Sequence, residues 1–351
     1  MENLTDLDAD LAEILSSNVG TAAKNAAGVR KDSYRDLVAF GNVTSYSMQQ
    51  LLHTCPRLFQ LQKLEAAMHQ ESIGDYLEED NVDFAFGHAV GAGVATFDET
   101  RDLEKAIWAA FLAWDIDLFA EKERNPGRPA PNKSFHHAIW ALKVYQTFFY
   151  EETDLADYKV VRNEATIAVD FENGHFYVGH IDTLLQKEVT GLYKVKENKT
   201  TVYSTVQPAL YSNSDQALSY ALVIDALGAA EYEVLYTVYS TSEMRWMAFE
   251  FSKDSLQKAE WLQDQTFTHS NIDLYEDKNF FPKRGSSCIQ FGKTCKFYES
   301  CDYDSERVYG RKYSDLRRLQ SFDELELIEH IDYKFTWSEI INRQKERAGG
   351  L

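Results

Sequence analysis

The chain has 351 residues and a net charge of −20, with 36 Lys and Arg against 56 Asp and Glu. Its hydrophobic fraction of 44% is ample for a packed core, and no apolar run approaches the roughly 20 residues that span a membrane. The charge argues against a protein that coats nucleic acid non-specifically, because such proteins need a broad basic surface. The acidic N-terminus lacks the pattern of a secretory signal, so we expect a cytoplasmic protein.

The first part of the chain is expected to be helical. Residues 1–42 are polar and are predicted to form an N-terminal arm, after which a helix begins at Ser45–Met48. Small and apolar residues around His88 are typical of a buried helix. Two amphipathic helices follow on either side of a loop rich in proline and glycine, and together they predict a helical insertion at about 100–155. The predicted helices cover residues 83–97, 103–117 and 133–152, and the loop covers 125–131.

From Tyr158 onward the hydrophobic pattern changes to that of strands. Strands are predicted over residues 160–169, 176–186, 192–199, 231–240 and 245–251, and helices over 215–229 and 253–269. This order predicts an α/β fold with a mixed central β-sheet flanked by helices. A single domain over residues 43–305, followed by a helical C-terminal tail over 306–351, is the expected organisation.

Two carboxylates and a lysine are predicted to meet on one hairpin. Paired positions in an antiparallel hairpin keep a constant sum, and for Asp182 and Glu197 that sum is 379, centred in the predicted turn at 187–191. In that register their Cβ atoms lie ~5 Å apart. Lys199, two residues beyond Glu197, projects from the same face of its strand.

Such a patch is poorly stable unless something offsets the repulsion between the carboxylates. A Mg²⁺ or Mn²⁺ ion does so with oxygen ligands, and it also lowers the pKa of a bound water and polarises a phosphate. Lys199 is then placed to orient that water or help deprotonate it. A solvated strand face is the ordinary alternative for Glu197 and Lys199 taken alone.

Four cysteines are spaced as a metal-binding set. Cys55 lies far upstream of Cys288, Cys295 and Cys301, and in a reducing compartment such a set favours metal ligation over disulfides. The four thiolates fit either Zn²⁺ or a [4Fe–4S] cluster, with unliganded buried thiols as the remaining alternative. Closing the 233 residues from Cys55 to Cys288 would stabilise the fold by restricting the unfolded chain.

Several short motifs, taken together, resemble the RecB-like branch of the PD-(D/E)XK nuclease superfamily. That branch includes nuclease domains of bacterial recombination complexes and CRISPR-associated iron–sulfur nucleases, and its fold is a restriction-endonuclease-like core. The resemblance covers residues 43–303 in the family order. The matching pieces are Ser45, Ser47 and Cys55–Phe59; Gly87-His88; Glu164; Val178–Asp182; Val195–Thr200; Gln216 with Tyr220; and the three downstream cysteines.

Carried over to these positions, the resemblance implies the roles of individual residues. His88, Asp182 and Glu197 would bind the metal, with the backbone carbonyl of Asn198 completing the set. Lys199 would activate water, and Gln216 and Tyr220 would support Lys199 or contact DNA. Core or surface positions are the ordinary alternatives for His88, Gln216 and Tyr220. The resemblance also favours a [4Fe–4S] cluster over zinc for the cysteines.

Two features depart from the family pattern. Lys196 stands where an apolar residue often precedes the acidic one, and the intervals between Cys288, Cys295 and Cys301 are longer than in many members. Beside the cysteines, Arg57 and Arg284 are candidate phosphate contacts, although solvated surface charges are the commoner explanation.

The sequence therefore predicts a metal-dependent DNA nuclease, a single-strand exonuclease. Gly292-Lys293-Thr294 is preceded by Ser287 where a P-loop needs glycine, so strand separation would require a helicase or recombination partner protein. A non-catalytic iron–sulfur or zinc subunit that serves DNA binding or assembly in a recombination or DNA-processing complex is the alternative. Action on RNA is a third possibility.

Overall fold

The computed structural model describes residues 42–62, 82–114, 133–212, 214–227, 232–290, 293–299, 301 and 331–349. The expected N-terminal arm lies outside these residues, except for Asn42, and so does the proline-rich loop at 125–131. Within the part of the chain that is described, no helix is long and apolar enough to cross a membrane.

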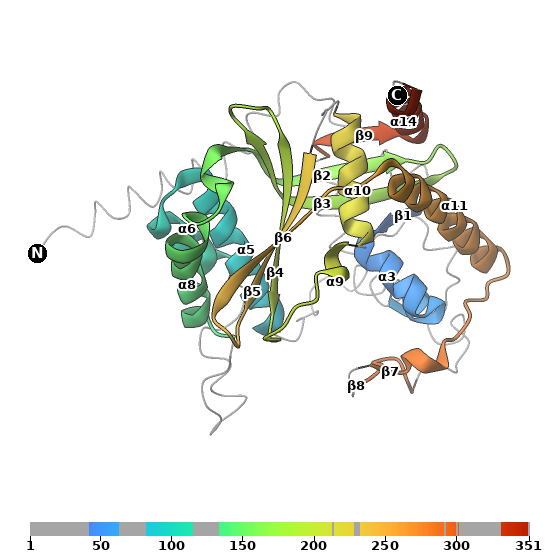
Figure 1. Cartoon of the computed structure of the whole chain (residues 1–351). Coiled ribbons are helices and arrows are strands. Elements are labelled where there is room, and N and C mark those ends of the chain that lie inside the picture. Colours follow the sequence, from blue (N-terminus) through green and yellow to red (C-terminus); the bar gives the residue numbers. More distant parts are fainter. Residues whose placement is uncertain are drawn as a thin grey trace, which may run out of the picture.

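A mixed seven-stranded sheet forms the centre of the molecule (Figure 1), as the strand pattern predicted. Its strand order is β6-β5-β4-β3-β2-β9, and β1 pairs with β3 in parallel. The β2–β3, β3–β4 and β5–β6 pairs are antiparallel, whereas β4–β5 and β2–β9 are parallel. The strands are β1 (Asn42–Ser45), β2 (Tyr158–Asp170), β3 (His175–Lys187), β4 (Tyr193–Thr201), β5 (Tyr232–Ser240), β6 (Arg245–Phe251) and β9 (Tyr333–Thr336). A separate small hairpin is formed by β7 (Ile289–Gln290) and β8 (Lys293–Thr294).

Helices cover both faces of the sheet (Figure 1). On one side lie α5 (Val82–Thr100), α6 (Leu103–Leu112) and α8 (Phe135–Val144), with the π-helical turn η1 (Tyr145–Tyr150) and the 3₁₀ turn η2 (Asp154–Asp157). On the other side lie α3 (Tyr46–Thr54), α9 (Ala209–Ser212), α10 (Asp215–Ala226), α11 (Ser255–Asp277) and α14 (Trp337–Gly349). The 3₁₀ turn η3 (Gly285–Ser287) precedes Cys288.

The helical insertion packs through aromatic and small apolar side chains. Residues of α5, α6 and α8 form one buried cluster with residues of β5 and β6, including Tyr239 and Trp246. The indole N–H of Trp246 donates to the backbone oxygen of Ala141 at 2.9 Å, which ties α8 to β6. Burial of this face explains why the pattern over residues 103–152 is amphipathic.

Glu164 lies inside β2, within the predicted strand over residues 160–169, and has a positive φ of 52°. Two boundaries differ from the sequence prediction. Helix α11 continues to Asp277, well beyond the predicted end at residue 269. Tyr333–Thr336 forms β9 within the tail that was predicted to be helical, because the edge of β2 offers backbone partners to an extended segment.

Candidate active site at the end of the β3–β4 hairpin

The β3–β4 hairpin has the register that the constant sum of 379 predicted. Its pairs run from Gln186↔Tyr193 to Thr183↔Lys196, and each sums to 379. Asp182 and Glu197 occupy the next positions, where regular pairing ends. The backbone N–H of Asn198 donates to Oδ2 of Asp182 at 2.8 Å, so the Asp182 carboxylate is fixed to the neighbouring strand. The hairpin thus brings the two carboxylates together.

Glu197 is more enclosed than Asp182 and Lys199. Its side chain is buried, and Oε1 accepts hydrogen bonds from Nζ of Lys199 at 2.6 Å and from Nε2 of Gln216 at 2.9 Å. Its other oxygen, Oε2, is buried and has no hydrogen-bond partner among the residues that the structure describes. A buried carboxylate oxygen without a partner is unfavourable, and a cation would relieve it.

The pKa values of Asp182 and Lys199 are both shifted by burial and by the neighbouring charges of the site. Burial first, and then the charge of Glu197, raise the pKa of Asp182 to about 7. For Lys199, burial lowers the pKa, but the charges of Glu197 and Asp182 outweigh it and raise the pKa above its ordinary value. Lys199 is therefore a cationic hydrogen-bond donor in this arrangement, whereas Asp182 binds a proton readily unless a cation takes its place.

Gln216 and Tyr220 link the carboxylates to helix α10. Nε2 of Gln216 also approaches the Tyr220 hydroxyl at 2.8 Å, and that hydroxyl donates to the backbone oxygen of His180. Burial raises the pKa of Tyr220 well above its ordinary value, so the phenol keeps its proton for this bond. The two residues, one helical turn apart, therefore hold Glu197 relative to β3. Gln216 shares Oε1 of Glu197 with Lys199, and no direct hydrogen bond joins Gln216 or Tyr220 to Lys199 among the described residues.

His88 is not gathered with the carboxylates into a ligand set. It lies exposed on α5, and its ring stacks on Phe84 with 6.5 Å between centroids. Its neighbour Gly87 lies close to β4, since a Cβ on Gly87 would lie 4.0 Å from Oγ1 of Thr200. The side chain of Asn198 is engaged elsewhere, because its Oδ1 accepts from the Thr237 hydroxyl at 2.6 Å, which leaves only its backbone carbonyl for a metal.

Glu164 belongs to the same row of acidic positions, although the sequence marked it only as one piece of the family resemblance. The β2–β3 pairs Asn163↔Thr183 and Ala165↔Ile181 place Glu164 opposite Asp182. Its carboxylate contacts His180, and its charge adds to the rise in the pKa of Asp182. A sequence signal for this pairing exists, because the pairs sum to 346 and centre on Asn173, in the Asn-Gly turn before β3.

Lys196, the departure from the family pattern, is completely buried behind the acidic pair. Its Nζ lies 2.6 Å from Oδ2 of Asp98 on α5, and the Tyr145 hydroxyl donates to Oδ1 of the same carboxylate at 2.8 Å. Arg101 is 3.9 Å from Asp98. At the position where the family pattern often has an apolar residue, this chain has a buried ion pair that fixes α5 against β4.

The four cysteines converge on one pocket. Cys55, which follows α3, is buried, and all four thiols are free of disulfides. Cys55, Cys288, Cys295 and Cys301 line the pocket together with the apolar side chains of Leu58, Leu61 and Phe297. The fold therefore brings together cysteines that are far apart in the sequence.

Of the two candidate phosphate contacts, Arg284 lines this pocket, and Arg57 is not among its lining residues. Arg57 is half-buried, and its guanidinium donates to Gln60 at 2.6 Å. Arg284 is exposed and lines the cysteine pocket from the segment after α11.

The acidic site has the donors that a divalent cation requires. Among the described residues, no three His, Cys, Asp or Glu side chains are already arranged as a ligand set. Even so, the partnerless Oε2 of Glu197 and the raised pKa of Asp182 both indicate negative charge that lacks a counter-ion. Hard divalent cations take such oxygen ligands, so the residues fit Mg²⁺ or Mn²⁺.

Similarity to known proteins comes from one family model and from solved structures. The family model described as "PD-(D/E)XK nuclease superfamily" matches residues 43–302. No curated protein matches the chain. A crystallised protein from Eubacterium rectale, named as an inferred exonuclease, is 10% identical with a TM-score of 0.41, over 78% of this chain and 97% of that one. The crystallised protein SSO0001 is 14% identical with a TM-score of 0.23, over 59% and 83%. Both TM-scores lie below 0.5, so the assignment rests on the family match.

Proposed function

The chain belongs to the PD-(D/E)XK nuclease superfamily, and we propose that it is a metal-dependent exonuclease acting on single-stranded DNA. The observation that carries the proposal is the arrangement of Glu197, held by Lys199 and Gln216, beside Asp182 at the end of the β3–β4 pairing. The net charge of −20 favours a strand gripped in one cleft over a duplex bound along a broad surface.

Asp182 and Glu197 would hold the cation, with the backbone carbonyl of Asn198 and, from α5, His88. The position of Gly87 beside Thr200 supports the part of His88 in this set. When bound, the cation would supply Lewis-acid polarisation of the scissile phosphate and an acidified water. Its chemistry suits the partnerless oxygen of Glu197 and the proton affinity of Asp182.

The protein's own groups position the reaction. Lys199 keeps its proton and, at 2.6 Å from Glu197, donates to the attacking water or to a phosphate oxygen on which charge develops. Gln216 keeps Glu197 in place, and Tyr220 anchors Gln216 to the backbone of β3. The Asn198 N–H holds Asp182 in its orientation. Together they preorganise charge and water around one phosphate.

Removing the Lys199 ammonium tests the proposed function. We expect Lys199→Ala to lower the rate of single-stranded DNA cleavage by roughly 100-fold to 1,000-fold, because stabilisation of the developing charge is lost. Lys159→Ala, which removes an exposed lysine from β2, should cleave at the wild-type rate. The measurement is turnover of end-labelled DNA with Mg²⁺ or Mn²⁺.

Three results would decide against the proposal as stated. Equal residual cutting by Lys199→Ala and wild type would place the activity elsewhere or in a contaminant. Wild-type protein that binds DNA but never cleaves would identify a binding subunit of a larger complex. Cutting of RNA in preference to DNA would change the substrate.

For the cysteines we propose a [4Fe–4S] cluster that joins the two ends of the nuclease domain. Four thiols line one largely apolar pocket, and four thiolates are the number of ligands that such a cluster takes. We expect freshly purified protein to be brown and to contain about four iron atoms per chain. Cys295→Ser should lose iron and melt at a lower temperature, because the link between residues 55 and 288–301 is weakened. A colourless protein with one zinc would replace the cluster by a single ion.

A further inference from the structure

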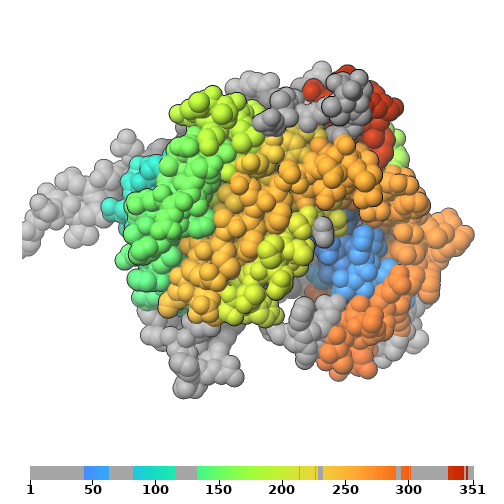
Figure 2. Space-filling view, in the orientation of Figure 1, coloured from blue at the N-terminus to red at the C-terminus, as the bar shows by residue number. Residues whose placement is uncertain are grey.

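A second hollow, lined by both polar and apolar side chains, lies between α3 and α11, outside the acidic site. Its volume is about 400 Å³, within the range of roughly 300–1,000 Å³ that small-molecule sites occupy. Figure 2 shows the blue residues of α3 set back between the yellow-green residues that follow β4 and the orange residues of and after α11. The lining residues are Leu52, His53, Pro56, Asp264, Phe267, Thr268, Asn271, Tyr275 and Arg284.

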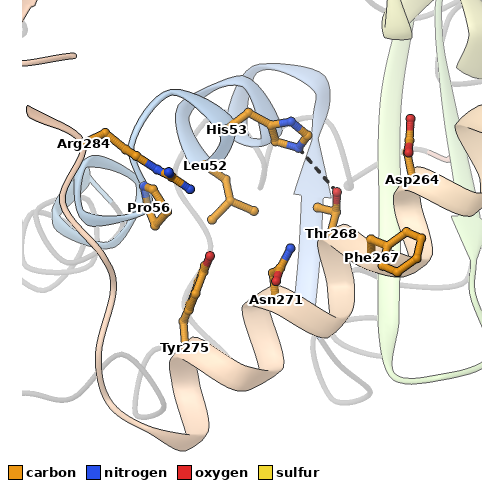
Figure 3. Close-up of a pocket in the computed structure, with 9 residues that line it drawn as sticks. All are labelled: Leu52, His53, Pro56, Asp264, Phe267, Thr268, Asn271, Tyr275 and Arg284. Carbon is orange, nitrogen blue, oxygen red and sulfur yellow. Dashed lines mark hydrogen bonds between the residues drawn. The ribbon is translucent and has the colours of Figure 1, made fainter. Parts of the chain in front are cut away.

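One wall of the hollow is a stripe along α11. Asp264, Phe267, Thr268, Asn271 and Tyr275 recur at helical spacing, so they share one face of the helix. Phe267 is 61% exposed, and such an apolar ring in the lining of the hollow offers a flat surface for stacking. In Figure 3 the Tyr275 hydroxyl and the Asn271 amide point into the same space.

The opposite wall carries positive charge. Arg284 points its guanidinium into the hollow (Figure 3), and among the described residues no carboxylate pairs with it. Nε2 of His53 lies 3.4 Å from the Thr268 hydroxyl at the far side. The hollow therefore combines a stacking ring, amide and carboxylate groups that suit a base edge, and a guanidinium that suits a phosphate.

The hollow lies between the acidic site and the cysteine pocket. Arg284 lines both the hollow and the cysteine pocket. At the other end, His53 and Asp264 are electrostatic neighbours of Asp215, since they act in opposite directions on the pKa of its half-buried carboxyl. Asp215 precedes Gln216, which holds Glu197. A strand that leaves the catalytic carboxylates past the N-terminus of α10 reaches the hollow next.

We propose that this hollow is a subsite for one unpaired nucleotide of the DNA strand, with the base stacked on Phe267 and its phosphate on Arg284. The inference rests on the proposed function, because it names a binding site for the same substrate away from the scissile bond. It also explains how an acidic protein holds a single strand. Stacking is insensitive to base identity and unavailable to a paired base, so the subsite selects unpaired DNA.

The test measures DNA binding separately from cleavage. A fluorescent single strand of about 12 nucleotides is titrated by anisotropy with full-length protein on the Lys199→Ala background and without added divalent metal, so that cleavage does not compete with binding. We expect Phe267→Ala to weaken binding about tenfold. Arg284→Ala should weaken it about fivefold. It should also reduce the slope of log affinity against log salt concentration by about one.

Matched controls isolate the hollow. Phe280→Ala removes an equally exposed ring, 59% against 61%, outside the lining residues, and Arg245→Ala removes an exposed arginine from β6. Both should bind as the parent does. With an intact Lys199, Phe267→Ala should raise KM about tenfold with little change in kcat, because the ring does not touch the scissile phosphate.

Several outcomes would overturn the inference. One is that Phe267→Ala and Phe280→Ala bind the single strand with equal affinity. Another is that Phe267→Ala lowers the affinity for blunt duplex DNA as much as it lowers the affinity for the single strand. The failures of the two proposals are distinguishable. Wild type that never cleaves but binds through Phe267 overturns the nuclease proposal alone. Cleavage with no effect of Phe267→Ala or Arg284→Ala on binding overturns the subsite alone.

Discussion

Asp182→Asn is expected to abolish DNA cleavage and, at the same time, to stabilise the metal-free protein above pH 7. Cleavage should fall at least about 1,000-fold, because a charged metal ligand is lost. Burial and the neighbouring Glu197 raise the pKa of Asp182 to about 7 in the folded protein, whereas the unfolded value is about 4. The folded protein therefore binds this proton more tightly than the unfolded chain does. The part of the stability that this proton contributes is lost as the pH rises from about 4 to about 7.

The measurement is denaturant unfolding of metal-free protein at pH 5 and pH 8. We expect the wild type to lose stability over this interval relative to Asp182→Asn, by about 1–3 kcal/mol. Mg²⁺ should restore the wild type at pH 8 and leave the variant unchanged, since only the wild type has both carboxylates. Asp277→Asn, at an exposed site, is the control. Parallel pH profiles of wild type and Asp182→Asn would show that Asp182 does not carry this charge repulsion.

The second large effect is expected at the buried ion pair between Lys196 and Asp98. Asp98→Asn leaves a fully buried ammonium without its counter-ion and should destabilise the protein by about 3–5 kcal/mol. Lys196→Met should cost less, because Asp98 keeps the Tyr145 hydroxyl and a more distant Arg101. The double variant should lose less unfolding free energy than the two single variants lose together, by about 1–3 kcal/mol.

The pH dependence of Asp98→Asn identifies the cause of its instability. Burial lowers the pKa of Lys196, and Asp98 opposes that shift in the wild type. Without Asp98 the folded protein releases the lysine proton more readily than the unfolded chain does. Stability of Asp98→Asn should therefore recover as the pH rises from 7 towards 10.

The ion pair also bears on catalysis, because Lys196 precedes Glu197 on β4. We expect cleavage by Asp98→Asn to fall roughly tenfold to 100-fold at a temperature where it remains folded, since a small displacement of Glu197 misplaces the reaction. Lys278→Met is the control, because the Lys278–Asp277 pair is exposed and contributes little. If Asp98→Asn had the same unfolding free energy as Lys278→Met, apolar burial alone would hold α5 to β4.

The sequence by itself determined much of the sheet and its hairpin. Strands β2–β6 lie within a few residues of their predicted ranges, because alternation or sustained apolarity is a local signal of an extended, buried segment. The register of the β3–β4 hairpin followed from one turn by counting, since antiparallel pairing propagates from the turn without further choice. The proximity of Asp182 to Glu197 therefore follows from the order of residues along the chain.

Only the tertiary structure decided what reaches this hairpin from elsewhere. The burial of Lys196 depends on Asp98 from α5, the orientation of Glu197 depends on Gln216 from α10, and β9 joins the sheet from the far end of the chain. The convergence of Cys55 with the downstream cysteines and the hollow beside α11 likewise depend on how α3 packs. Such contacts join residues about 20 to more than 200 positions apart, and helix packing fixes them, whereas sequence periodicity reports only which face of an element is buried.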